Sequence, residues 1–253
     1  MKRIALIICV LAVGAAGCAS NSSSNSKADP VRASQINLDL AVDHLRKGNL
    51  ALAKEKLDRS LDQDPRNAAA HSVAGLLYDR LGNASKADSH FQRAVSLAPD
   101  NSEYKNNYAV FLCQQGRHAR GEKLALQAAS DRLYRTPEIA YFNAGTCARN
   151  AGNLESAEQH FRNALKLKPR FEEALLQMAD IEYEQKNYMS ARAFLQRYME
   201  VGRTTPVSLW LGVRIERSLG NTAVAQHYAQ RLKTEYPNAN QTKELVESER
   251  NPG

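Results

Sequence analysis

The feature that most constrains the fold is a phrase of ten residues that the chain contains twice. The stretch HFQRAVSLAP at His90–Pro99 returns as HFRNALKLKP at His160–Pro169. Two unrelated amphipathic helices could share apolar spacing, but not His, Phe, Ala, Leu and Pro at the same five offsets. The chain therefore contains an internal repeat, which is the sequence signature of a stacked-repeat architecture.

Prolines give the length of the repeating unit. Pro99 follows Pro65 by 34 residues, and Pro169 follows Pro99 by two such units plus two residues. The extra residues lie in the stretch SDRLYRTPE at residues 130–138. Six units then cover residues 34–239, and we number them one to six in the order 34–67, 68–101, 102–137, 138–171, 172–205 and 206–239.

Four positions within the unit carry restricted residue types. Position 8 is Ala or Gly except for Val213, and position 20 is Ala or Gly throughout. Position 24 is Leu, Phe or Ala, so a small residue can face a larger one. Position 15 is Gly in all units except unit five, which has Lys186, and Gly suits the left-handed turn that ends a helix. Each unit is therefore predicted to form two amphipathic helices of about 12 to 14 residues that pack closely.

The same positions resemble the tetratricopeptide repeat, whose pattern contains a small residue, an aromatic residue, Ala, Phe and a closing Pro. The resemblance implies an all-α fold, a right-handed α-solenoid of six tetratricopeptide repeats, each an antiparallel helix pair. Each unit in such a solenoid buries its apolar face only against its neighbours. Residues 240–253 form a charged C-terminal tail that is expected to be helical at its start.

The N-terminus has the layout of a secretory signal. Residues 1–17 carry a basic start, an apolar run too short to span a bilayer, and small residues before Cys18. The sequence Ala15-Ala16-Gly17-Cys18 resembles the lipobox of bacterial lipoproteins, which implies lipidation of Cys18 and removal of residues 1–17. Residues 18–33 are then expected to be a flexible tether, and Ala19 implies sorting to the outer membrane, facing the periplasm. The alternative is a plain secreted protein that is cut near Ala16.

No motif in the sequence predicts catalysis, a metal site or a cofactor. Neither the HExxH nor the GxSxG pattern occurs, and the phosphate-loop-like stretch GRHARGEK has Glu122 where the lysine should be. The formal charge of +7 comes without a Lys/Arg run longer than two, so we expect no nucleic-acid partner. A small-molecule substrate is not expected either. The histidines are scattered, and a metal shared by His90 and His160 is not expected because two repeats separate them.

Two cysteines remain once the signal and the lipidated Cys18 are set aside. Cys113 and Cys147 lie on first helices of adjacent units, which are expected to be side by side, and the compartment is oxidising. A disulfide between them is one hypothesis. Two small buried apolar residues are the other.

A groove for a partner is predicted along the first helices. In tetratricopeptide arrays, positions 2, 5, 9, 12 and 13 of these helices line the concave surface, which implies an apolar strip in units one to three and a polar wall in units four to six. The strip is expected to bind a partner segment, because contiguous exposed apolar patches mark interaction sites. Alternatively, Leu38 and Val42 pack as a terminal cap against the tether. Trp210 suits either an interface or the core of unit six. The predicted strip consists of Leu38, Val42, Leu45, Leu76 and Val110.

The chain resembles the type IV pilus biogenesis and stability lipoproteins, the pilotins of the pilus secretin. The resemblance rests on the lipobox, the Ser/Asn-rich tether, the six repeats and the two cysteines within about 250 residues. This resemblance implies an outer-membrane adaptor, held by acyl chains, that binds secretin subunits and promotes their outer-membrane localisation and multimerisation for pilus assembly and twitching motility. The alternative is a scaffold for peptidoglycan enzymes or for outer-membrane barrel assembly.

Overall fold

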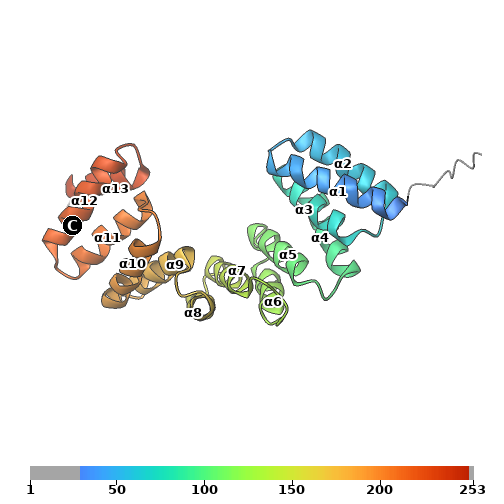
Figure 1. Ribbon diagram of the computed structural model, residues 1–253. Helices are drawn as coiled ribbons and strands as arrows, with labels where there is room; N and C mark the ends of the chain where they lie inside the picture. Colours follow the sequence, from blue (N-terminus) through green and yellow to red (C-terminus); the bar gives the residue numbers. More distant parts are fainter. Residues whose placement is uncertain (1–28, 251–253) are drawn as a thin grey trace, which may run out of the picture.

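The computed structural model describes residues 29–250, and Figure 1 shows its helices as an open arc. No strand occurs in this range, and none of its helices combines the length and the apolar character that a membrane crossing requires. The helices are α1 (Pro30–Arg46), α2 (Leu50–Gln63), α3 (Ala68–Arg80), α4 (Ala84–Leu97), α5 (Ser102–Gln114), α6 (His118–Ala129), α7 (Pro137–Asn150), α8 (Leu154–Leu167), α9 (Glu172–Glu184), α10 (Tyr188–Val201), α11 (Pro206–Ser218), α12 (Thr222–Glu235) and α13 (Asn240–Arg250).

Consecutive helices form the six predicted pairs, from α1 with α2 to α11 with α12, and each pair packs together. Each second helix also packs on the first helix of the next unit, and first helices of neighbouring units lie beside one another, as α1 does with α3 and α3 with α5. Units one and two form one arm of the arc, and units five and six form the other (Figure 1). The predicted all-α solenoid of antiparallel pairs is confirmed.

The first helix begins earlier than the sequence predicted. Pro30 occupies the first turn of α1, and the Asp29 carboxylate accepts a hydrogen bond of 3.0 Å from the Val31 amide. Proline is tolerated in the first turn of a helix because the backbone N–H that it lacks would have no intrahelical partner there. Residues 30–33 therefore belong to α1, which corrects the predicted tether of residues 18–33. The predicted signal peptide, Cys18 and the tether up to residue 28 lie outside the described residues.

The turns inside the pairs have the predicted left-handed conformation. At position 15, Gly82 has φ 71° and Lys186 has φ 64°. Glycine adopts this conformation without the steric penalty that a Cβ brings. The same conformation occurs at Gly48, Gly116, Gly152 and Gly220.

In units two and four the glycine at position 8 faces the phenylalanine at position 24, as predicted. A Cβ placed on Gly75 would lie 2.7 Å from Cδ1 of Phe91, and one on Gly145 would lie 2.6 Å from Cε1 of Phe161. Both phenylalanines are buried, at 1% and 0% exposure. The two glycines therefore make room for the aromatic rings that fill units two and four.

Candidate partner-binding groove

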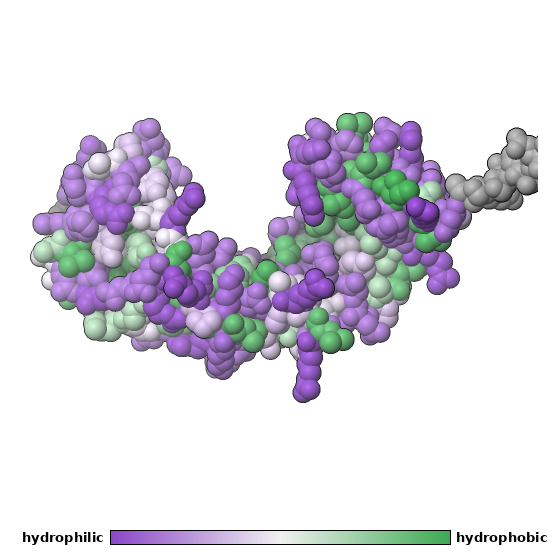
Figure 2. Space-filling view, viewed as in Figure 1, coloured by the Kyte–Doolittle hydropathy of each residue, from purple (hydrophilic) through white to green (hydrophobic). Residues whose placement is uncertain are grey.

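A groove of about 420 Å³ runs across the first helices of units one to three. Helix α1 and helix α3 supply its apolar walls, while α5 adds polar groups at one edge. Figure 2 shows hydrophobic surface gathered on the N-terminal arm, whereas the visible face of the opposite arm is more hydrophilic. The apolar lining consists of Leu38, Val42, Leu45, Ala69, Val73 and Leu76.

The structure brings together four of the five predicted groove residues. Leu38 and Leu45 are only 3% and 6% exposed, because they also belong to the core that α1, α2 and α3 share. They form the floor of the groove, while the half-buried Val42 and Leu76 are its accessible apolar side chains. Val110 is half-buried on α5 and does not line the groove. The predicted strip is thus shorter and deeper than the repeat positions alone suggested.

Polar groups surround this apolar floor. The Arg80 guanidinium donates a hydrogen bond of 2.9 Å to the Leu45 carbonyl, which ties α3 to the end of α1. Burial, with the neighbouring Glu103 carboxylate, raises the pKa of Tyr104, so its hydroxyl stays protonated at neutral pH. The remaining polar lining consists of Asp39, Arg46, Ser72, Glu103 and Asn107.

Sequence reasoning missed part of this lining for an identifiable reason. Position 6 of the unit contributes Asp39, Val73 and Asn107, one residue from each of the three units. Position 6 was absent from the set of groove positions carried over from tetratricopeptide arrays, and so was position 3, which supplies Tyr104. Because Asp39, Val73 and Asn107 share no side-chain type, the sequence alone carries no signal for position 6.

The inner wall of units four to six is charged and internally paired. The Arg149 guanidinium donates to the Asp180 carboxylate at 2.5 Å and to the Glu184 carboxylate at 2.6 Å. Asp180 also accepts a bond of 3.3 Å from Arg214, whose guanidinium lies 4.7 Å from the centre of the Tyr183 ring. These side chains pair mainly with one another, although Nε of Arg214 is buried without a hydrogen-bond partner, so this wall offers fewer free charged groups than its composition suggests.

Trp210 is half-buried and packs against the core of unit six. Its ring centre also lies 6.0 Å from the Arg214 guanidinium. Of the two roles that the sequence left open, the contacts favour stabilisation of the last unit.

Cys113 on α5 and Cys147 on α7 form a disulfide, with their Cα atoms 5.3 Å apart. The bond joins unit three, the last unit that lines the groove, to unit four, and both residues are buried. Position 20 of unit three is Gly121, and a Cβ there would lie 2.5 Å from the Cys113 sulfur and 2.9 Å from the Ala109 carbonyl oxygen. The glycine therefore leaves the space that the disulfide occupies.

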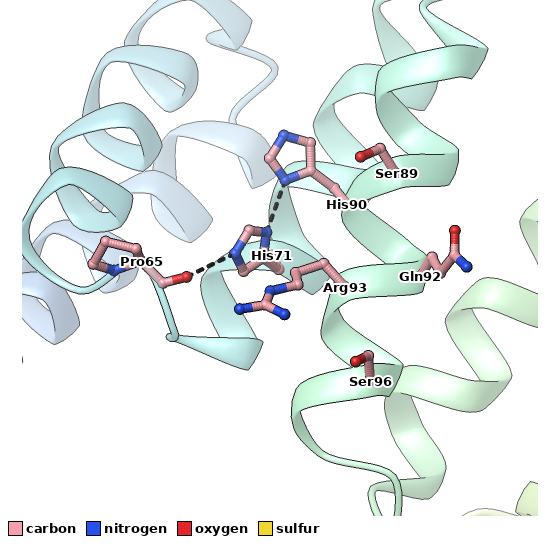
Figure 3. Close-up of a pocket in the computed structure, with 7 residues that line it drawn as sticks. All are labelled: Pro65, His71, Ser89, His90, Gln92, Arg93 and Ser96. Carbon is pink, nitrogen blue, oxygen red and sulfur yellow. Dashed lines mark hydrogen bonds between the residues drawn. The ribbon is translucent and has the colours of Figure 1, made fainter.

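A second hollow, of about 480 Å³, lies between the α2–α3 turn and α4 (Figure 3). His71 bonds through Nε2 to the Pro65 carbonyl at 3.1 Å, and its Nδ1 lies 3.0 Å from Nδ1 of His90. Since a carbonyl only accepts, neutral His71 carries its proton on Nε2 and accepts from His90. Burial is the main cause that lowers the pKa of both imidazoles. The pair is thus a neutral packing contact between α3 and α4.

His160 occupies the repeat position of His90 but has a different partner. Its Nε2 lies 2.8 Å from the Glu122 carboxylate of the preceding unit. Within residues 29–250, no group of three or more His, Cys, Asp or Glu side chains is placed to hold a metal ion.

Comparison with known proteins matches the repeats to tetratricopeptide models at residues 38–101, 73–136 and 148–207. The chain is 28% identical to the type IV pilus assembly protein PilF of Pseudomonas aeruginosa over 236 residues, which is 92% of this chain and 94% of PilF. A solved structure of Pseudomonas aeruginosa PilF superposes with a TM-score of 0.78 at 26% identity, covering 87% of this chain and 99% of that one. The crystal structure of PilW, described as a widely conserved type IV pilus biogenesis factor, superposes with a TM-score of 0.78 at 29% identity, covering 84% and 98%.

Proposed function

The chain belongs to the tetratricopeptide repeat superfamily, and from this premise we propose that it is a pilotin of type IV pilus biogenesis. In this role it binds subunits of the pilus secretin and promotes their localisation and multimerisation in the outer membrane. Similarity to PilF and PilW over most of their lengths supports a role in pilus biogenesis. The groove of units one to three is the observation that carries the adaptor function.

The groove favours reversible capture of a short apolar segment. Full burial of one Leu or Phe side chain of a partner contributes about 1.5–3 kcal/mol. The floor formed by Leu38 and Leu45 is packed into the core of units one and two. The polar rim of Asp39, Arg46 and Glu103 can orient the backbone and polar side chains of the segment. This is recognition without covalent chemistry, as expected for a repeat scaffold.

Membrane anchoring completes the proposed mechanism. Acyl chains on Cys18 would keep the solenoid at the outer membrane, where the bound subunit must insert. A tether raises the local concentration of the two binding partners without any new contact. Replacement of Cys18 by Ser is expected to release the protein into the soluble periplasmic fraction.

The test is a charge substitution in the accessible part of the groove. Val42→Asp and Leu76→Asp are each expected to weaken binding of the purified periplasmic region of the secretin by at least tenfold, because about 1.4 kcal/mol corresponds to a factor of ten. Val207→Asp is the matched control, since Val207 is an apolar residue, 49% exposed, on the first helix of unit six. Titration calorimetry gives the affinity and circular dichroism verifies the fold.

The same variants are then expressed in cells that lack the wild-type gene. Loss of secretin multimers with the groove variants, and their retention with the control, supports the proposal. Unchanged affinity and normal multimers with both groove variants would refute it.

A further inference from the structure

A second apolar face of α1, distinct from the groove, is exposed, whereas the equivalent face of the other five first helices is covered. Positions 3 and 7 of the first helices lie toward the second helix of the preceding unit, although Tyr104 at position 3 of unit three also lines the groove. In units two to six these ten positions are buried, except for Tyr104, which is half-buried. In unit one they are Ile36 and Leu40, which are 53% and 43% exposed.

The internal copies show what covers this face. In every case the preceding second helix packs on the first helix, as α4 does on α5 and α8 on α9. Phe91 of α4 stacks on Tyr108 at position 7, with ring centroids 5.9 Å apart. The Tyr108 hydroxyl also donates a hydrogen bond of 2.7 Å to the Asp88 carboxylate of α4.

Position 11 shows the polar part of the same interface. In unit five it is Glu182, which is buried and accepts a hydrogen bond of 2.7 Å from Arg162 of α8. In unit six it is Glu216, which pairs with Arg192 of α10. In units five and six the covering helix therefore supplies an oppositely charged side chain at this level, whereas units two to four have Tyr78, Leu112 and Ala148 there. At position 11, unit one has the half-buried His44, and a carboxylate of a covering helix could pair with this imidazole.

The two ends of the solenoid differ. At the C-terminal end, α13 packs on α11 and α12, buries Thr242 and Leu245, and turns polar residues such as Lys243 and Glu247 to solvent. Such a polar cap is what a repeat array needs at its ends. Within residues 29–250, no helix gives α1 the same cover.

We propose that an amphipathic α-helix of a partner protein packs on Ile36 and Leu40, in the place that a preceding second helix takes in the other five units. The helix presents apolar residues at spacings of three and four, with a carboxylate near His44. An amphipathic helix of this kind needs larger apolar residues, and the stretch Ala19–Ala28 of this chain contains no apolar residue other than alanine. The face is separate from the groove, so the inference holds or fails independently of secretin capture there.

The experiment places a photo-cross-linking amino acid at Leu40 of the full chain in its native cells. The matched control carries it at Leu167, which ends α8 and is 53% exposed, the same value as Ile36. We expect a cross-link from Leu40 alone, with mass spectrometry placing the partner residue in an amphipathic helical segment. That segment is then synthesised as a peptide.

The peptide is expected to gain helicity on binding the purified chain, and Ile36→Asp or Leu40→Asp should weaken its binding at least tenfold. Leu167→Asp should leave the peptide affinity unchanged. The Ile36 and Leu40 variants should keep the wild-type affinity for the purified periplasmic region of the secretin, which is the probe for the groove. Absence of a cross-link at Leu40, or a cross-link only to lipid or to a second copy of this chain, overturns the proposal. Peptide binding that is insensitive to both charge substitutions overturns it as well.

Discussion

At the scale of single residues, the residue type at several repeat positions follows from the space that the neighbouring side chains leave. Gly75 and Gly145 face Phe91 and Phe161, while Gly121 faces the disulfide, so small residues stand opposite large groups. Lys186 shows that residue type can vary where the backbone does not: it has the left-handed conformation at position 15, where the other units have glycine. The repeat therefore constrains backbone shape more strictly than it constrains residue type.

The His71–His90 contact leads to a pH prediction. The ordinary histidine pKa is 6.5, and both folded values are lowered, chiefly by burial. The unfolded chain therefore takes up protons at a higher pH than the folded chain, and acid favours unfolding. The stability that this pair contributes is present above about pH 6.5 and is lost as the pH falls through the lowered folded values.

Urea unfolding between pH 7.5 and 5 measures the effect. The free energy of unfolding of the wild type should fall over this range, and the fall should be smaller in a His71→Gln, His90→Gln double variant. His227→Gln is the control, because His227 is exposed on α12. Identical pH profiles for wild type and double variant would contradict the prediction.

At the scale of helices, the sequence predicted the two helices of each unit and the turn between them, because glycine at position 15 and the recurring prolines mark where helices end. The prediction of a tether over residues 18–33 misplaced the start of α1, because Pro30 stands in the first turn of a helix capped by Asp29. In the groove, the sequence could not show that Leu38 and Leu45 are shared with the core, because that depends on how closely α2 and α3 approach α1. Val110 was misassigned for a related reason, since helix orientation decides which residues of α5 reach the groove.

The disulfide between α5 and α7 is expected to stabilise the junction of units three and four. Its sequence separation of 34 residues corresponds to about 3–4 kcal/mol in the chain-entropy model. Replacement of both cysteines by Ser should lower the free energy of unfolding by this order, measured by chemical denaturation. Unreduced wild type should react with alkylating reagent at neither Cys113 nor Cys147, and mass spectrometry detecting both as alkylated would contradict the assignment.

At the scale of the whole molecule, the inner surface of the arc divides into an apolar half and a charged half. Units one to three present an apolar groove with free binding capacity, whereas Arg149, Asp180, Glu184 and Arg214 hold units four to six together. Stability and partner affinity should therefore respond to different substitutions. This separation is a property of the complete array, because every unit has the same backbone plan and only the side chains differ.

Asp180→Asn tests this division together with Val42→Asp. Arg149 and Arg214 share the Asp180 carboxylate, so its loss leaves two guanidinium groups without that partner. Hydrogen bonds to charged groups are worth about 1.5–3 kcal/mol, and these side chains are partly exposed. Asp180→Asn should therefore lower the free energy of unfolding by about 1–2 kcal/mol. Its affinity for the secretin region should stay within twofold of wild type. Val42→Asp should show the reverse, with nearly native stability and at least tenfold weaker binding, because Val42 is half-buried at the accessible edge of the groove. If Asp180→Asn abolished binding while Val42→Asp did not, the partner would have to dock on the C-terminal half, and the charged network would be its binding site rather than an internal brace.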